Sequence, residues 1–237
     1  MITGVSGVEL AVLFILTLCA LEISFAVSSS AISLFSPGGQ YIMLTFDDGP
    51  HSSFTPKILD ILREKNVKAT FFVYGSKVVS HRSLLARMHA EGHEIANHGW
   101  SHHASFTKQV PEQLERMVKQ TRSVISNCTG GNDSAASEFI RPPLGNTNPQ
   151  VNAHITKALG LRVVLWSLDS KDYLAKTAQE VVDSVVPKAK PGDIVLFHDI
   201  FAPTVEALPL IIDQLFMQGY EFLTLQRVAS YPDDSPK

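Results

Sequence analysis

The sequence predicts an α/β fold in which helices surround a parallel sheet. From residue 40 onward, short apolar runs rich in β-branched and aromatic residues alternate with longer amphipathic stretches. The 237 residues, 45% of them hydrophobic, suffice for one domain with a sizeable core or at most two small ones. Alternation of this kind is typical of a parallel sheet. Seven strands with six helices fit either a doubly wound sheet or an incomplete (β/α) barrel.

The expected elements alternate along the chain from the first strand to the last. The strands are expected at 41–46, 69–74, 93–96, 138–141, 161–168, 193–198 and 221–225. The helices are expected at 55–65, 81–91, 111–127, 149–159, 177–188 and 203–218. Thr55 followed by Pro56 is a helix-start signal, with Thr55 as the cap and Pro56 at the first helical position.

The first 30 residues have the character of a targeting segment. Residues 10–21 are almost wholly apolar but are short for a membrane span, and small residues follow them. We expect a signal peptide over 1–30, cut after Ala26 or near Ser30, and a protein that is extracellular or in the cell wall. No lysine or arginine precedes Lys57, so an uncleaved membrane anchor is the alternative.

The net charge and the cysteine content limit the binding partners and the covalent links that the sequence predicts. Removing residues 1–30 takes away Glu9 and Glu22 and no basic residue, which changes the net charge from −3 to −1. The sequence has no run or stripe of basic residues, so nucleic acid is not an expected partner. Cys128 would be the one cysteine left after cleavage, so no internal disulfide is expected. The protein is also expected to be a monomer. Asn127 and Asn132 head glycosylation sequons in a polar stretch that reads as a loop.

Polar residues gather where the expected strands end. The carboxyl ends of parallel strands meet on one rim, and sites in α/β folds form there. The residues in question, in chain order, are Asp47, Asp48, Asn97, His98, His102, His103, Arg141, Asp169, Asp172, His198 and Asp199.

The spacing of two histidines suggests a metal site. His98 and His102 are four residues apart, and two histidines with one carboxylate form a catalytic zinc set. Asp48 or Asp47 could supply the carboxylate. The alternative is that these histidines are merely solvated at the start of a loop. His93 begins a strand, at the opposite rim, and is left out.

Two further residues have backbones suited to a catalytic task. Arg141 precedes Pro142, which keeps Arg141 extended, so its guanidinium could brace a carboxylate. His198 ends a stiff buried strand, as a general acid requires. Taken singly, a surface arginine and a core histidine bonded to the backbone are the simpler interpretations.

These residues belong to five short motifs that occur in order. They are TFDDGP (45–50), HGWSH (98–102), RPPLG (141–145), DSKDY (169–173) and LFH (196–198). With them the chain resembles the NodB-homology polysaccharide deacetylases of carbohydrate esterase family 4, over about residues 40–227. The resemblance implies a distorted, incomplete (β/α) barrel of about seven parallel strands with outer helices. The domain would span 40–228, followed by a tail at 229–237.

The resemblance also implies a role for each motif residue. Asp48, His98 and His102 would bind one divalent metal ion, usually zinc and sometimes cobalt or another ion. Asp47 would be the general base and Arg141 would hold it in place. His198 would be the general acid, oriented by Asp172, which would raise its pKa. The Leu144 N–H would help to bind the oxyanion, and Leu196 would line the pocket for the acetyl methyl group.

The implied reaction is hydrolytic N-deacetylation of an N-acetylglucosamine polymer. Chitin is the first expected substrate and peptidoglycan the second. Leu144 stands where the family commonly has an aromatic residue, and Tyr173 where it often has tryptophan; neither change removes a catalytic atom. A catalytically silent carbohydrate-binding relative and an amidase acting on small acetylated amines are the alternatives.

Overall fold

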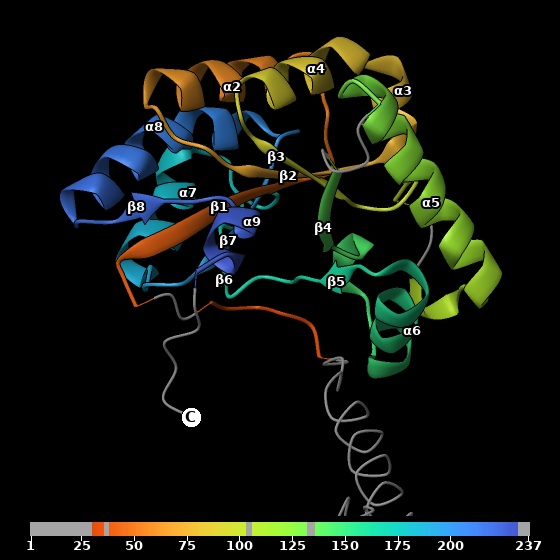
Figure 1. Ribbon diagram of the computed structural model, residues 1–237. Helices are drawn as coiled ribbons and strands as arrows, with labels where there is room; N and C mark the ends of the chain where they lie inside the picture. The colour runs from red at the N-terminus through yellow and green to blue at the C-terminus, as the bar shows by residue number, and fades with distance from the viewer. Residues whose placement is uncertain (1–29, 36–37, 103–105, 132–135, 232–237) are drawn as a thin grey trace, which may run out of the picture.

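The computed structural model describes residues 30–35, 38–102, 106–131 and 136–231 (Figure 1). The predicted targeting segment lies outside these residues except for Ser30, and so do His103, Asn132 and the end of the predicted tail from residue 232. Within the described residues, no helix is long and apolar enough to cross a membrane. Asn127 is exposed in the last turn of a helix, as the expected helix at 111–127 implied, and not in the loop that its polar surroundings had suggested.

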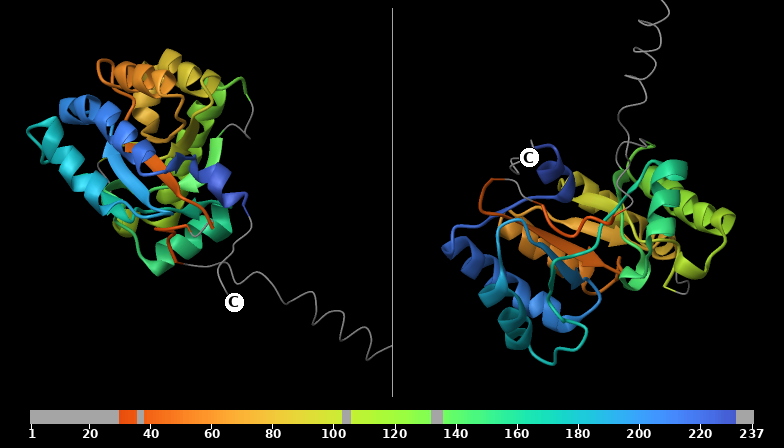
Figure 2. Two further views of the ribbon diagram at one scale, coloured as in Figure 1. Left: turned by 90° about the vertical axis from the view of Figure 1, so that its left-hand side faces the viewer. Right: turned by 90° about the horizontal axis from the view of Figure 1, so that it is seen from below.

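A curled parallel sheet forms the centre of the molecule. Its strands are β1 (Tyr41–Asp47), β2 (Thr70–Val73), β3 (Glu94–Asn97), β4 (Ala136–Ile140), β5 (Arg162–Val163), β6 (Leu168–Asp169), β7 (Ile194–His198) and β8 (Glu221–Phe222). Seven of them run in the order β5-β4-β3-β2-β1-β7-β6, and β8 pairs with the start of β1. The views in Figures 1 and 2 show the sheet bent into a half-barrel. This confirms the predicted α/β fold and settles the alternative in favour of the incomplete barrel.

Amphipathic helices cover the outside of this half-barrel. The longer ones are α2 (Thr55–Glu64), α4 (Arg82–Ala90), α5 (Pro111–Cys128), α6 (Pro149–Leu159), α7 (Ala178–Val185) and α8 (Ala202–Met217). In α2, for example, Ile58, Leu59 and Leu62 are buried while the charged residues face solvent. The main core therefore lies between the helices and the outer face of the sheet, with Phe46 stacked on Phe71 and Phe197.

The inner face of the sheet packs against short segments instead. Met43, Phe72 and Ile194 point inward and form a second cluster with the five-residue helix α9 (Leu225–Ala229). Ile32 and Phe35 pack against the same cluster, and the Ile32 N–H donates to the Val163 carbonyl at 2.8 Å. Segments before β1 and after β8 thus fill the interior of the half-barrel.

The predicted strand at 161–168 is wrong as one unit. It is two short strands, β5 and β6, at opposite edges of the sheet, joined by residues 164–167. This link crosses the open side of the half-barrel, where it hydrogen-bonds to Ile32 and Ile194. An apolar run can cross a barrel as well as extend a strand, and its hydropathy does not distinguish the two.

Smaller departures affect the helices. The predicted helix at 177–188 is α7 followed by a 3₁₀ turn at Val186–Lys188, because Pro187 cannot continue the α-helical hydrogen bonding. Helix α3 (Gly75–Ser80) and α9 were not predicted, since each is too short to show periodicity. Thr55 is the first residue of α2 rather than its cap; its hydroxyl donates to buried Asp199 instead.

Candidate active site

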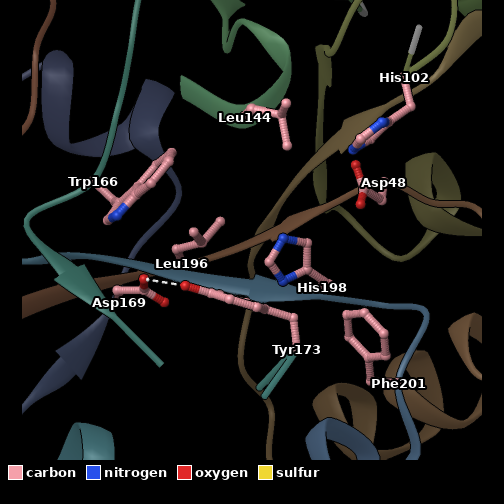
Figure 3. Close-up of a pocket in the computed structure, with 9 residues that line it drawn as sticks. All are labelled: Asp48, His102, Leu144, Trp166, Asp169, Tyr173, Leu196, His198 and Phe201. Atoms are coloured by element: carbon pink, nitrogen blue, oxygen red, sulfur yellow. Dashed lines mark hydrogen bonds between the residues drawn. The ribbon is translucent and has the colours of Figure 1, made fainter. Parts of the chain in front are cut away.

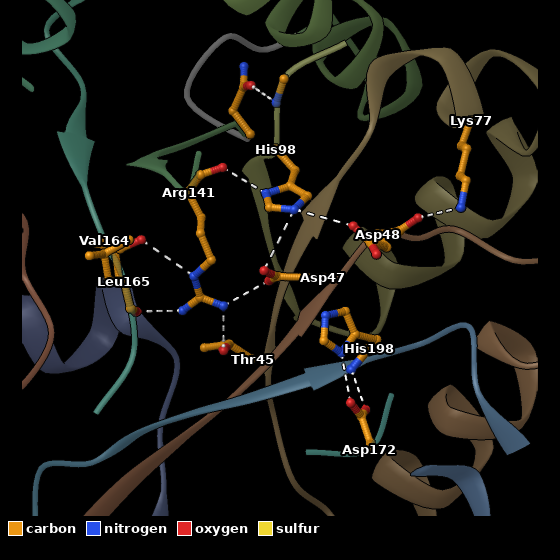
Figure 4. A network of polar contacts seen from close by, with 12 residues as sticks. Thr45, Asp47, Asp48, Lys77, His98, Arg141, Val164, Leu165, Asp172 and His198 are labelled. Carbon is orange, nitrogen blue, oxygen red and sulfur yellow. Dashed lines mark hydrogen bonds and ion pairs between the residues drawn. The ribbon is translucent and has the colours of Figure 1, made fainter. Parts of the chain in front are cut away.

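The register of the sheet brings the motifs at the ends of β1 and β7 together. Asp47 is the last residue of β1 and His198 the last of β7, and the two are direct partners in the parallel pairing. Arg141 follows β4, and its N–H donates to the carbonyl of Asn97 at the end of β3. Asp47, Arg141 and His198, three of the polar residues predicted for one rim, therefore do meet at the carboxyl ends of the strands (Figure 4).

Asp47 and Arg141 form a buried ion pair. The Arg141 Nη1 lies 2.7 Å from Asp47 Oδ1 and also donates to the Thr45 hydroxyl at 2.8 Å. The Nη2 donates to the Leu165 carbonyl at 2.7 Å, and the guanidinium lies 4.1 Å from the centre of the Phe72 ring. Arg141 is fully buried and Asp47 is 3% exposed. Burial lowers the pKa of Arg141, against the opposing effect of the Asp47 charge.

His98 faces two carboxylates through one ring nitrogen. Its Nδ1 lies 2.7 Å from the Arg141 carbonyl, an acceptor only, so Nδ1 carries the proton of that hydrogen bond. The other nitrogen, Nε2, lies 3.4 Å from Asp48 Oδ1 and 3.6 Å from Asp47 Oδ2. A neutral His98 would direct a lone pair at two anions, which is unfavourable unless a cation or a second proton lies between them.

These donors have the chemistry of a divalent-metal site. His102 lines the same pocket as Asp48, and Figure 3 shows its ring directed toward that carboxylate. Burial raises the pKa of the Asp48 carboxyl, but interactions led by His98 lower it overall, below its ordinary value. One carboxylate and two imidazoles suit zinc. Among the described residues, no three such side chains lie close enough together to hold a metal ion as they stand. The match to a zinc site therefore rests on the types of the donor groups and on their common place at this pocket.

His198 is held by Asp172. The His198 Nδ1 lies 2.7 Å from Asp172 Oδ1, and its backbone N–H donates to Oδ2 at 2.7 Å. The Thr204 hydroxyl donates to the same Oδ2, again at 2.7 Å, which fixes the carboxylate. Burial lowers the pKa of His198, but its contact with Asp172, with help from Asp47 and Asp48, raises it to about 9. His198 is therefore protonated at neutral pH.

A pocket of about 370 Å³ opens above these residues. It is lined by Asp48, His102, Leu144, Trp166, Asp169, Tyr173, Leu196, His198 and Phe201 (Figure 3). Five of the nine predicted site residues line it. The other four, Asp47, His98, Arg141 and Asp172, are buried and contact the lining residues or one another. Leu144 is 69% exposed at φ 60°, a left-handed conformation that costs a non-glycine residue about 1 kcal/mol.

The turn after β1 is fixed by several backbone contacts. The Asp48 carbonyl accepts from Lys77 Nζ at 2.7 Å, and the Gly49 carbonyl accepts from the Tyr74 N–H at 3.0 Å. Asp199 lies fully buried beneath Gly49, and burial raises its pKa to about 7. A Cβ on Gly49 would clash with both Asp199 carboxylate oxygens. Glycine is thus required here by close approach.

We expect a Gly49→Ala substitution to lower the free energy of unfolding by about 1–3 kcal/mol, because the buried Asp199 carboxylate has no room to move away. Urea denaturation measures the change. In an Asp199→Ala background, where the blocking oxygens are gone, the same substitution should cost much less. An equal cost in both backgrounds would show that the contact with Asp199 is not the cause.

Several residues of the site were missed from the sequence. Trp166 was hidden within the predicted strand at 161–168, which is in fact the crossing link. Lys77 lies on the unpredicted helix α3, and nothing in its sequence context marks it. Tyr74 directly follows β2, at the same edge of the sheet as the predicted site residues, so its position at a strand end is the signal that could have found it.

Comparison with known proteins agrees with this geometry. Residues 36–164 match the family model described as polysaccharide deacetylase. The chain is 39% identical over 187 residues to the peptidoglycan-N-acetylglucosamine deacetylase PgdA of Listeria monocytogenes, covering 79% of this chain and 38% of that protein. It is 35% identical over 205 residues to the chitooligosaccharide deacetylase of a Bradyrhizobium species, covering 81% and 91%. The chain therefore belongs to the polysaccharide deacetylase family.

A solved structure extends the similarity to three dimensions. The peptidoglycan N-acetylglucosamine deacetylase Bc1960 superposes with a TM-score of 0.79 at 31% identity, over 86% of this chain and 94% of that one. The matched region thus includes nearly all of the half-barrel. The chain spans less than two fifths of the length of PgdA.

Proposed function

We propose that the protein is a metal-dependent hydrolase that removes acetyl groups from N-acetylglucosamine polymers, with chitin or chitin oligosaccharides as the first substrate class. The observation that carries this proposal is the meeting of all five motifs at one pocket. That pocket combines a carboxylate paired with a buried arginine, a protonated histidine held by an aspartate, and a carboxylate–imidazole donor set. Metal-dependent amide hydrolysis uses a general base, a general acid and a metal ion, which are the parts that these three components would supply.

The metal proposed for the site is a single divalent ion, zinc first and cobalt or another ion as alternatives. Asp48, His98 and His102 would hold it, which selects Asp48 over Asp47 as the carboxylate ligand. When bound, such an ion would polarise the acetyl carbonyl and lower the pKa of a water molecule.

The other residues would act on protons and on the developing negative charge. Asp47 would accept a proton from the attacking water, with its carboxylate held by Arg141. The Leu144 backbone N–H would donate to the oxyanion. His198, protonated and oriented by Asp172, would then donate a proton to the departing amine. Leu196 would contact the acetyl methyl group in the pocket.

Peptidoglycan is the second candidate substrate, and the comparisons favour it as much as chitin. PgdA and Bc1960 are described as peptidoglycan deacetylases, whereas the Bradyrhizobium relative is described as acting on chitooligosaccharides. Both polymers present N-acetylglucosamine, so the pocket itself does not choose between them. The protein would meet either one outside the cell or in the cell wall, as a monomer.

A mass-spectrometric screen of both polymers tests the proposal. Chitin oligosaccharides and peptidoglycan fragments are incubated with the protein, with and without a chelator. Loss of 42 mass units per acetyl group, prevented by the chelator, is expected for at least one polymer. Intact products from both polymers at every metal tested would contradict the proposal, and binding without turnover would favour a silent carbohydrate-binding relative.

The His198–Asp172 pair makes stability depend on pH. Folding raises the pKa of His198 from 6.5 to about 9, so its contribution is complete below about pH 6.5 and is lost as the pH rises through 9. For the chelated protein this contribution is about 3 kcal/mol at most. Urea denaturation at pH 6.5 and 9.5 should show a drop in the parent that is much smaller in Asp172→Asn. Parallel drops in the two proteins would mean that other groups are responsible.

A further inference from the structure

Tyr74 touches every predicted metal ligand. It follows β2 directly, and its side chain is buried, with 2% of its surface exposed. Its ring centre lies 4.8 Å from that of His98 and 6.2 Å from that of His102. The Asp48 carboxylate lies close enough to its hydroxyl for the two groups to interact. One aromatic side chain thus lies among all three groups.

The hydroxyl of Tyr74 is buried but has no partner of ordinary hydrogen-bond geometry among the described residues. A buried hydroxyl left unpaired is unfavourable, since it gives up its bonds to water. The acceptor available to it is Asp48, the carboxylate that acts on the phenol. An ionised carboxylate can only accept a hydrogen bond, so the phenol O–H is the donor in this pair.

We infer that Tyr74 is a positioning residue of the metal site, an inference that rests on the proposed function. With a divalent ion in the site, its hydroxyl would donate to Asp48 and so hold that carboxylate in place as a ligand, while its ring packs against both imidazoles and fixes their orientation. Groups that orient ligands in this way commonly change metal affinity by 10- to 100-fold when removed. Tyr74 acts through Asp48, His98 and His102 and does not touch the reacting atoms.

The alternative is that Tyr74 is an ordinary core residue whose hydroxyl does nothing. The two interpretations predict different effects of removing the hydroxyl on metal affinity. Removing an unpaired buried hydroxyl leaves the stability of the metal-free protein unchanged or improves it. If Tyr74 positions the ligands, the same change weakens metal binding. A variant that is at least as stable but binds metal less tightly therefore cannot be explained by damage to the fold.

Tyr74→Phe in the full chain is the test. Zinc affinity is measured by competition with a chromogenic chelator, and the melting temperature is measured on the chelated protein. We expect the zinc dissociation constant to rise about 10-fold with no fall in melting temperature. Cobalt absorption spectra give a second readout, because a reoriented ligand set alters the intensity of the visible bands.

Tyr220→Phe is the matched control. Tyr220 is also buried, but its hydroxyl donates to the Ala189 carbonyl at 2.8 Å. It directly precedes β8, which pairs with the start of β1, at the opposite end of that strand from Asp48. It should lower the melting temperature and leave zinc affinity unchanged. Parent-like zinc affinity and cobalt spectra in Tyr74→Phe would overturn the inference. A parent protein that binds no divalent ion would instead contradict the proposed function.

Discussion

An Asp47→Asn variant is expected to lose about 10³-fold in kcat for deacetylation while keeping its bound metal. Asparagine has nearly the shape of aspartate and its carbonyl can still accept from Arg141, but it cannot take a proton from water. Asp47 contacts Arg141 at 2.7 Å and His98 at 3.6 Å, without being one of the proposed ligands. Acetate release and metal content, measured on the same preparation, check the prediction.

Asp48→Asn is the control for this result, because the two carboxylates are neighbours in sequence with different proposed tasks. It should lower metal affinity, and its activity should recover in part as the metal concentration is raised. Asp47→Asn should not recover at any concentration. If both variants lost metal to the same degree, the division of tasks between Asp47 and Asp48 would be wrong.

The second large effect is expected for Arg141→Met, which should lower the free energy of unfolding by about 3–5 kcal/mol. The substitution keeps an apolar side chain of similar length beside Phe72 but leaves the Asp47 carboxylate buried without its cation. It also leaves the Leu165 carbonyl without its 2.7 Å donor. Urea denaturation at neutral pH measures the loss.

The double variant Asp47→Leu with Arg141→Met separates charge burial from packing. With both charges gone, much of the lost stability should return, because a buried pair replaced by apolar groups is often no less stable than the pair. Activity should stay absent, since the proposed base is missing. A double variant as unstable as Arg141→Met alone would show that packing rather than the unpaired carboxylate causes the loss.

Strand–helix alternation was enough to predict the sheet and its outer helices, because each element buries one face and its sequence shows the period. It failed at 161–168, where an apolar run crosses the open side of the barrel between two edge strands. Hydrophobic pattern reports burial, and a buried link has the same pattern as a buried strand. The short helices α3 and α9 escaped for a related reason: fewer than two turns leave no period to detect.

The candidate site was predictable to the extent that its residues follow strands. Asp47, Arg141 and His198 were placed correctly because the end of a parallel strand fixes where the next side chain goes. Their contacts were not open to prediction: the Arg141 bonds to Val164 and Leu165 depend on where the crossing link runs. Tyr74 is aromatic and ends an apolar run, so its residue type does not distinguish it from the core, and only its place directly after β2 points to the site.

The most direct test of the proposed function is a titration of zinc into the chelated parent protein, with acetate release from chitin oligosaccharides and peptidoglycan fragments followed alongside bound metal. The site described here predicts that acetate release from at least one polymer rises in proportion to bound zinc and reaches its plateau at one ion per chain. Full activity in the chelated protein, or no acetate from either polymer once one ion is bound, would contradict it.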